Sequence, residues 1–295
     1  MPVSVVAAMT AEPAPRRRRR AKATAPATPA DTTEPLILVT GGTGTLGELV
    51  VARLREAHRR VRVLSRTKHD AASGVTYVVG DLVTNTGVQA AVKGAGVILH
   101  LASTKSDDVA ATRNLVEAAS ALKTPPHLIF VSIVGADRVD SSYMVTKLES
   151  ERVIRNAELP WTILRTTQFY ELALTGAQRS ARFPLIFAIS GFLVQPVDAG
   201  EVAARVVELA TGEPAGRVPD LGGPEVMSAA AIIRSYLRAT KRRGVVVPFW
   251  MPGLNKIRTG GLLVRKRRKP AGSDDAEETE AAPQRTWEEF LKERA

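Results

Sequence analysis

Short apolar runs alternate with amphipathic stretches between residues 36 and 165, and this alternation constrains the fold more than any other feature. The runs are rich in Val, Ile and Leu and are almost continuously apolar. Strands of this kind are buried on both faces, which indicates a parallel sheet covered by helices. We therefore predict an α/β protein with a doubly wound, parallel-sheet Rossmann fold. The predicted strands are 36–40, 61–65, 75–79, 97–102, 127–132 and 161–165, and the helices between them are 45–58, 107–121 and 142–157.

A glycine-rich stretch joins the first predicted strand to the first predicted helix. Gly41, Gly44 and Gly47 fall at the spacing G-x-x-G-x-x-G. Glycine permits a tight turn and a close approach of pyrophosphate to the backbone, and the helix N-terminus offers N–H groups to phosphate. In this strand–loop–helix setting the motif predicts a dinucleotide site. The contacts expected from this stretch are Thr40, Gly41, Gly42, Thr43, Gly44, Thr45, Leu46 and Gly47.

The end of the second predicted strand distinguishes the two nicotinamide cofactors. NAD sites usually place an acidic side chain there for the ribose diol, whereas this chain has Ser65 and Arg66, followed by Lys68. Arg66 can pair bidentately with a 2′-phosphate, and Ser65 and Lys68 can assist it. The sequence therefore favours NADP(H) over NAD(H).

The third and fourth predicted strands also end in candidate cofactor residues. Asp81 and Leu82 follow the third strand. Asp81 either accepts a hydrogen bond from the adenine amino group or caps a helix that starts near residue 85, and the sequence leaves both roles open. Leu101, Ala102 and Ser103 end the fourth strand and are expected to border the nicotinamide half of the site.

Tyr143 and Lys147 are the candidate catalytic pair. They lie four residues apart at the start of the helix after the fifth strand, so they share one helix face, and Ser132 ends that strand. A lysine beside a tyrosine stabilises the phenolate, and the tyrosine can then exchange a proton with a carbonyl oxygen during hydride transfer. Ser132 would hydrogen-bond that oxygen. In the alternative, Tyr143 only packs and Lys147 only binds the cofactor ribose.

Residues beyond the sixth strand are expected to form the substrate side of the site. The candidate pocket residues are Thr166, Gln168, Phe169 and Tyr170. Phe183, Phe187 and Phe192 are expected to pack in the core, with a lid or a pocket wall as the alternative. Gln195 and Asp198 are expected to cap and pack rather than to contact substrate.

Composition excludes several kinds of site. The chain has no cysteine, which excludes disulfides, thiolate catalysis and Cys-ligated metals. Its four histidines, at positions 58, 69, 100 and 127, show no ligand spacing, so no metal is predicted. With 295 residues, 44% of them hydrophobic, the chain can bury a large core.

The formal charge of +11 is unevenly distributed. Residues 35–240 are nearly neutral, whereas 241–270 carry ten basic residues and no acidic one. Cations beside apolar residues there can touch an anionic membrane or nucleic acid, but we favour a solvated face balanced by the acidic run 274–280. No nucleic-acid fold signature is present, so no nucleic-acid partner is expected.

The sequence shows neither a secretory signal nor a span that could cross a membrane. The arginine run 16–20 is not followed by an apolar stretch, so it is no secretory signal. We favour a solvated low-complexity extension, with an organellar transit peptide as the alternative. The most apolar span, 183–197, is shorter than the ~20 residues of a bilayer helix and contains two prolines. We therefore expect a soluble cytoplasmic protein.

Several of these motifs together resemble the short-chain dehydrogenase/reductase superfamily. They are TGGTGTLG at 40–47, LSR at 64–66, GDL at 80–82, HLAS at 100–103, FVSIVGAD at 130–137, the Tyr143/Lys147 pair and LPWTILRTTQFYE at 159–171. The nearest branch is the atypical, NmrA-like NAD(P)-binding group. The resemblance implies a seven-stranded Rossmann fold with a small C-terminal substrate lobe. It also implies cofactor roles for Gly41, Gly44, Gly47, Arg66 and Lys147 and a catalytic role for Tyr143.

The expected organisation has four parts. They are a disordered Ala/Pro/Arg-rich tail (1–34), a Rossmann domain whose substrate lobe forms mainly after 166 (35–240), a basic then acidic, partly disordered segment (241–285), and a terminal helix packing back on the domain (286–295). Later helices are predicted at 197–211 with Asp198 as N-cap, at 228–240 with Ser228 as N-cap, and at 286–294 with a Thr286–Glu289 capping box.

Three functions remain open at this point. The first is an NADPH-dependent oxidoreductase acting on a carbonyl or activated double bond of a small molecule. The second is a non-catalytic NADP(H)-binding sensor that regulates a protein partner, and the third is a sugar-nucleotide epimerase-like enzyme. The sequence leaves the substrate and a choice between monomer and dimer undecided.

Overall fold

A seven-stranded parallel sheet forms the centre of the computed structural model, which describes residues 34–70, 74–104, 107–250, 259–265 and 283–294. The strand order is β3-β2-β1-β4-β5-β6-β9, and every neighbouring pair is parallel. The seven-stranded, doubly wound Rossmann fold is thereby confirmed. The strands are β1 (Leu36–Thr40), β2 (Val61–Ser65), β3 (Val75–Val79), β4 (Ala95–His100), β5 (His127–Ile133), β6 (Trp161–Thr166) and β9 (Gly216–Arg217).

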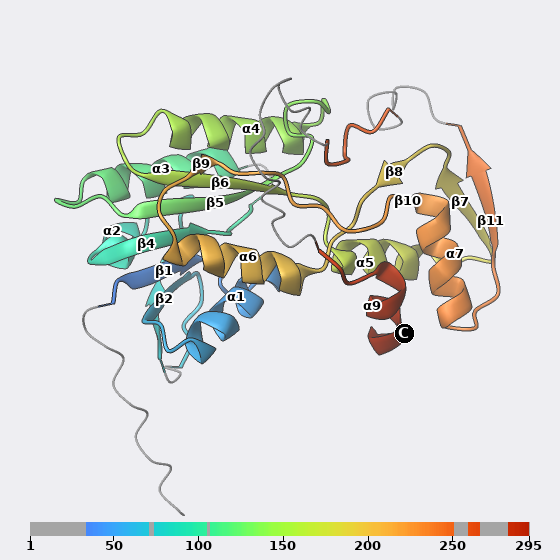
Figure 1. The fold of residues 1–295 in the computed structure, drawn as a ribbon, viewed down its shortest axis with the longest axis horizontal. Coiled ribbons are helices and arrows are strands. Elements are labelled where there is room, and N and C mark those ends of the chain that lie inside the picture. Colours follow the sequence, from blue (N-terminus) through green and yellow to red (C-terminus); the bar gives the residue numbers. More distant parts are fainter. Residues whose placement is uncertain (1–33, 71–73, 105–106, 251–258, 266–282, 295) are drawn as a thin grey trace, which may run out of the picture.

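Helices cover both faces of this sheet (Figure 1). One face packs against α1 (Thr45–Glu56) and α6 (Ala199–Thr211), and the other against α2 (Val88–Val92), α3 (Asp108–Ser120) and α4 (Ser142–Arg155). The strand order reverses between β1 and β4, and ligands of such sheets bind at the carboxyl ends of the strands beside that reversal. The fold therefore positions a site at the ends of β1 and β4.

The C-terminal part of the chain forms a lobe that the strand alternation did not predict in detail. It contains α5 (Tyr170–Ser180), α7 (Ala229–Ala239) and α9 (Trp287–Arg294). Two small sheets accompany them: parallel β7 (Leu185–Ile189) with β11 (Val245–Phe249), and antiparallel β8 (Leu193–Val194) with β10 (Met227–Ser228). Strand β11 lies in the segment expected to be partly disordered; residues 251–258 and 266–282 of that segment lie outside the described residues, as does the predicted disordered tail except for Glu34.

The aromatic residues of this lobe differ from expectation. Tyr170, predicted to face the pocket, is buried against Trp287 and Phe290 and donates its hydroxyl to the Arg285 carbonyl at 2.7 Å. Its position at the first residue of α5 turns it into the lobe core. Phe183 and Phe187, predicted to pack in the core, are 64% and 61% exposed. Phe192 does pack, half-buried, against the lobe core.

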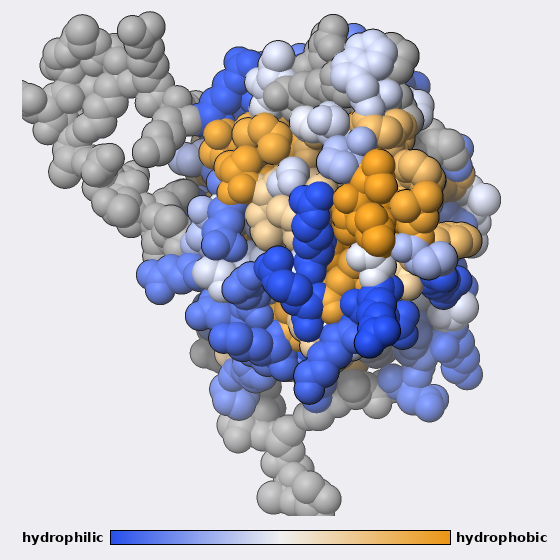
Figure 2. All heavy atoms as spheres, turned by 90° about the vertical axis from the view of Figure 1, so that its right-hand side faces the viewer, coloured by the Kyte–Doolittle hydropathy of each residue, from blue (hydrophilic) through white to orange (hydrophobic). Residues whose placement is uncertain are grey.

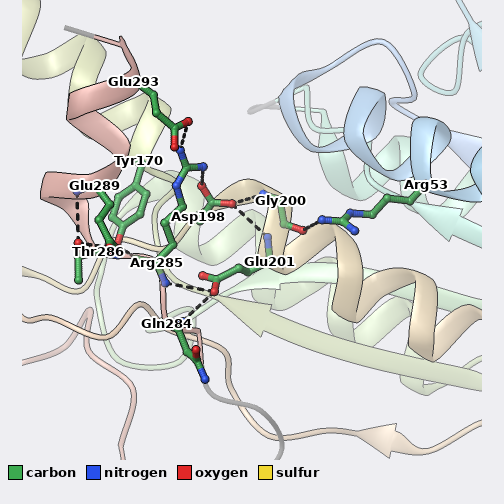
Figure 3. A network of polar contacts seen from close by, with 10 residues as sticks. All are labelled: Arg53, Tyr170, Asp198, Gly200, Glu201, Gln284, Arg285, Thr286, Glu289 and Glu293. Carbon is green, nitrogen blue, oxygen red and sulfur yellow. Dashed lines mark hydrogen bonds and ion pairs between the residues drawn. The ribbon is translucent and has the colours of Figure 1, made fainter.

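A network of hydrogen bonds and ion pairs joins the terminal helix to the Rossmann domain (Figure 3). Arg285 pairs with Asp198 at 2.6 Å, while Asp198 also caps α6 by accepting from the Gly200 and Glu201 amides. Glu201 accepts in turn from the Gln284 and Arg285 amides. The predicted N-cap role of Asp198 is thus confirmed.

The remaining predicted caps are also confirmed. Ser228 accepts from the Ala231 amide, and Thr286 and Glu289 exchange the two hydrogen bonds of a capping box. Gln195 packs as expected, donating to the Gly223 carbonyl. None of the helices in the described ranges has the length and apolar character needed to cross a bilayer.

Candidate active site

A cavity of about 520 Å³ lies at the carboxyl ends of β1 to β4. The structure brings nearly all the predicted cofactor residues to its wall: Thr40, Gly41, Thr43, Gly44, Thr45, Leu46, Gly47, Ser65, Arg66, Asp81, Leu82, Leu101, Ala102 and Ser103. Three predicted residues are absent from this wall: Lys68, Lys147, which lines the neighbouring cavity, and Gly42. The α-carbon of Gly42 faces β2, and a β-carbon there would lie 2.8 Å from Val63. Gly42 therefore serves helix–sheet packing.

Two glycines of this loop have no possible substitute. Gly41 has φ +70°, and a β-carbon on it would lie 2.6 Å from the Ala102 amide nitrogen. A β-carbon on Gly47 would lie 2.0 Å from the Gly41 carbonyl oxygen. Gly44 is the N-cap of α1 and supplies no side chain to cap it, so the first-turn N–H groups of α1 face the cavity uncapped. This cradle fits the pyrophosphate of a dinucleotide.

The far end of the cavity carries the predicted 2′-phosphate residues. Arg66 is exposed, and its guanidinium has no partner among the residues that the structure describes. The Ser65 hydroxyl lies 3.0 Å from Nε2 of His69, which also contacts the Thr67 hydroxyl at 3.0 Å. The sequence analysis missed His69, whose only sequence signal was its place in the same short loop. The polar cluster beside Arg66 thus consists of two hydroxyls and an imidazole.

The structure separates the two roles left open for Asp81. Helix α2 begins at Val88 with Gly87 as its N-cap, so Asp81 does not cap it. Instead, Oδ1 of Asp81 accepts from the Val83 amide at 2.7 Å, and the residue lines the nucleotide cavity. The other carboxylate oxygen remains available for an adenine amino group.

A second cavity of about 740 Å³ continues from the first at the ends of β5 and β6. The two cavities share Leu46, Leu101, Ser103 and Phe169 in their walls. Tyr143 and Lys147 line this second cavity from one face of α4, as their spacing predicted, and Ser132 lines it from β5. The remaining lining residues are Val131, Ile133, Ser142, Thr146, Thr166, Thr167, Gln168 and Leu172. The predicted catalytic residues therefore meet where the cofactor cavity ends.

Lys147 is held by a buried carboxylate that the sequence analysis did not identify. Its Nζ lies 2.9 Å from Oδ2 of Asp108, and both side chains are at most 5% exposed. Asp108 also accepts from the Ser103 hydroxyl and from the amide and hydroxyl of Thr104. Burial alone would raise the pKa of Asp108, but the charge of Lys147 and these hydrogen bonds outweigh it and hold that pKa below its usual value. The ammonium group thus has a fixed position and a fixed counter-charge.

The ammonium of Lys147 lies close to two aromatic rings. It is 5.8 Å from the ring centroid of Tyr143 and 5.1 Å from that of Phe130. Tyr143 is 36% exposed at the cavity mouth. A cation over a ring face is stabilising by about 0.5–2 kcal/mol, which favours this orientation of the tyrosine. The tyrosine side chain therefore lines the cavity, lies beside the ammonium and carries a hydroxyl proton.

Ser132 has a different environment from the one expected. Its hydroxyl donates to Oε1 of Glu151 at 2.5 Å, and Glu151 is clamped bidentately by Arg165 at 2.7 and 2.6 Å. Burial would lower the pKa of Arg165, but the hydrogen bonds and charges of Glu151 and Asp137 raise it. A hydroxyl has one proton to donate. While this bond holds, Ser132 can accept from a cavity ligand but cannot donate to a carbonyl oxygen.

His100 lies buried behind the ion pair. Its ring bonds the hydroxyls of Thr40 at 2.8 Å and Thr112 at 3.1 Å. Burial, and then the charge of Lys147, lower its pKa to about 3, against an opposing effect of Asp108. The imidazole is consequently neutral at physiological pH, and it joins Thr40 to Thr112 behind the site without adding charge.

The lowered pKa of His100 leads us to expect that the stability of the protein depends on pH. Its folded pKa of about 3 lies below the ordinary 6.5, so the unfolded chain binds the extra proton between these values and stability is lost as pH falls through them. From pH 7 to pH 5 the free energy of unfolding should fall by about 2 kcal/mol more in the wild type than in His100→Gln. Denaturant unfolding at both pH values measures this difference. If the free energy of unfolding fell equally with pH in the two proteins, the lowered pKa of His100 would be contradicted.

The control is His58→Gln, which replaces an exposed histidine and should leave the pH dependence of the wild type nearly unchanged. His127→Gln is unsuitable as a control, because burial lowers the pKa of His127 in the same direction. Asp108 has a lowered pKa as well, but its stabilisation is lost only below its ordinary value of 3.8, outside the measured window.

Comparison with known proteins places the chain in a family. Residues 41–189 match the family model described as NAD(P)H-binding. The chain belongs to this NAD(P)H-binding family. Together with the Rossmann fold and the reductases it is similar to, this membership confirms the resemblance to the atypical short-chain dehydrogenase/reductase superfamily.

Members of the superfamily with known activities include reductases. The chain is 30% identical over 203 residues to the (4-alkanoyl-5-oxo-2,5-dihydrofuran-3-yl)methyl phosphate reductase of Streptomyces griseus, covering 66% of this chain and 70% of that protein. It is 27% identical over 216 residues to the NAD(P)H azoreductase of Xenophilus azovorans, covering 70% and 74%. The NADPH-dependent quinone oxidoreductase of Escherichia coli shares its fold, with a TM-score of 0.70, 18% identity, and coverage of 87% of this chain and 99% of that one.

Proposed function

We propose that this chain is an NADPH-dependent reductase acting on the carbonyl group or activated double bond of a small, uncharged organic molecule. The observation that carries the proposal is the joining of the two cavities: the tyrosine hydroxyl and the lysine ammonium lie where the glycine-cradled nucleotide cavity opens into a second, larger one. When bound, the nicotinamide cofactor would supply a hydride. The reductases among the relatives support the reaction class.

The chain's own residues divide the work of binding. Gly41 and Gly47 allow the backbone to approach the pyrophosphate, and Arg66 pairs with the 2′-phosphate. Lys147, fixed by Asp108, is placed to donate to the cofactor ribose while it stabilises negative charge near Tyr143. The shared wall residues then hold the nicotinamide between the two cavities.

Tyr143 is the proposed proton donor. Its side chain lines the cavity, whereas the proton of Ser132 is committed to Glu151. Reduction of a carbonyl needs one proton at the oxygen as the carbon gains hydride. Ser132 would instead accept a hydrogen bond from a substrate hydroxyl or amide, which orients the substrate. This is a narrower role than the sequence analysis gave it.

The lining of the larger cavity favours an uncharged substrate. Lys147 is its single cationic lining residue among those the structure describes, and Asp108 already neutralises it. Leu46, Leu101, Val131, Ile133 and Leu172 make much of the wall apolar. A phosphorylated or nucleotide-linked substrate would need a basic partner that this wall lacks. Ketones, enones and quinones fit this chemistry, and the epimerase-like alternative fits it poorly.

Replacing Arg66 with Ala tests the cofactor preference. We expect NADPH affinity to fall about 10- to 100-fold, because hydrogen bonds to charged groups contribute about 1.5–3 kcal/mol, while NADH affinity changes less than about threefold. Calorimetric titration of both dinucleotides measures the two constants. Lys93→Ala, an exposed cation outside both cavities, is the control. Equal losses for NADPH and NADH in Arg66→Ala would contradict the preference.

A further inference from the structure

One exposed surface of the lobe is unusually apolar for a face turned to solvent. In β7 the side chains alternate: Ile186 and Ala188 are buried, whereas Leu185 and Phe187 are 49% and 61% exposed. The parallel register pairs Leu185 with Val245 of β11, which is 63% exposed. We define the apolar face as Phe183, Leu185, Phe187, Val245 and Trp250, the last of these 66% exposed at the end of β11. Contiguous apolar surface of this kind usually marks an interaction site.

The same lobe holds much of the protein's excess positive charge. Two described stretches of this lobe, 172–197 and 226–250, contain no Asp or Glu but two and five Lys or Arg residues respectively. Arg182 adjoins Phe183, and Lys241, Arg242 and Arg243 precede Val245; all four are exposed. Figure 2 shows the result from this side, with orange apolar surface bordered by blue hydrophilic side chains. Arg238 does not count among these border cations, because it pairs with Glu288 of α9.

We propose that this apolar face docks on the surface of a phospholipid bilayer that carries anionic headgroups. The exposed aromatic and aliphatic side chains would enter the headgroup boundary, and the flanking cations would pair with lipid phosphates. Tryptophan favours this boundary because its ring is apolar and its N–H is polar, and the exposed Trp250 directly follows β11. The association is peripheral, since no described helix can span a bilayer.

Other occupants fit the face less well. A second copy docking through the same face would bring two cationic borders together. The acidic run 274–280 contains no large apolar side chain that could cover Phe183 and Phe187. Nucleic acid offers phosphates but no apolar phase for Leu185 and Val245. A bilayer surface satisfies both the apolar and the cationic components.

Vesicle binding by the full chain tests the proposal. We expect binding to vesicles of phosphatidylcholine mixed with phosphatidylglycerol, little binding to phosphatidylcholine alone, and weakening by salt. Brominated lipid should quench Trp250 emission, because Trp287 is fully buried and Trp161 half-buried. The double variant Phe183→Ser/Phe187→Ser and the triple variant Lys241→Gln/Arg242→Gln/Arg243→Gln should each bind at least about tenfold more weakly.

Matched controls separate the face from general basicity. Lys93→Gln/Arg113→Gln/Lys123→Gln removes three exposed cations from the opposite part of the fold and should leave binding within about twofold. Replacing arginines 16–20 with Gln should leave Trp250 quenching intact. NADPH affinity should be unchanged in every variant, so failure here is distinct from failure of the proposed reductase activity.

Three results would overturn the proposal. One is equal vesicle binding by the serine double variant and the wild type. Another is a change in the sedimentation of the free protein when the apolar face is altered, which would assign the face to self-association. The third is binding to duplex DNA that competes fully with vesicles and is insensitive to the serine substitutions.

Discussion

Replacing Tyr143 with Phe should lower turnover about 100- to 10,000-fold and leave NADPH affinity nearly unchanged. The substitution removes the hydroxyl that we propose as proton donor, and positioned proton transfer contributes a factor of this size. The ring remains, so its contact with the Lys147 ammonium also remains. Steady-state kinetics with a quinone or ketone, beside a titration with NADPH, measure the two effects separately.

A matched tyrosine variant controls for the loss of a hydroxyl. Tyr77 lies on β3 and lines neither cavity, so Tyr77→Phe should retain wild-type turnover. If Tyr143→Phe retained it as well, the proton-donor role would be wrong, and the alternative in which Tyr143 only packs would stand.

Removing Asp108 is the second large perturbation. Asp108→Ala leaves the Lys147 ammonium buried without its counter-charge, and breaking a buried ion pair costs about 3–5 kcal/mol of the free energy of unfolding. The double variant Asp108→Leu/Lys147→Met should recover most of that loss, because an apolar pair replaces an ionic one. It should nevertheless bind NADPH poorly, since it lacks the lysine that we propose as donor to the cofactor ribose. Denaturant unfolding and cofactor titration report the two outcomes.

The exposed pair Arg152–Glu149 provides the comparison for this experiment. Its side chains are 59% and 43% exposed, and exposed pairs contribute about 0–1 kcal/mol. Glu149→Ala should therefore cost far less than Asp108→Ala. Similar losses in the two variants would show that Asp108 does not hold Lys147 as described.

The Rossmann part of the molecule was predictable because its signals are local. Gly41, Gly44 and Gly47 sit in one turn, and the place of Arg66 after a strand follows from the order of the chain. The strand alternation gave the sheet, because a strand buried on both faces is recognisable from its own few residues. Tyr143 and Lys147 were found by spacing on a single helix.

The supports of the site were not predictable, because their partners are distant in sequence. Asp108 lies 39 positions before Lys147, and Arg165 lies 33 positions after Ser132, to which it is joined only through Glu151. Nothing local indicates that these side chains meet. The same reason explains Tyr170, whose partner helix begins at Trp287, and β11, which pairs with β7 across 60 residues. Tertiary pairing, rather than local propensity, decides such elements.

In the proposed reaction, hydride passes from NADPH to a substrate held beside Tyr143. The most direct measurement is turnover of a panel of quinones, ketones and enones with NADPH deuterated on each face of the nicotinamide ring. We expect at least one panel member to be reduced, deuteration of one face to slow the reaction, and Tyr143→Phe to abolish most of it. If NADPH bound tightly while no panel member was reduced by either protein, the chain would be a dinucleotide-binding sensor and the reductase assignment would be contradicted.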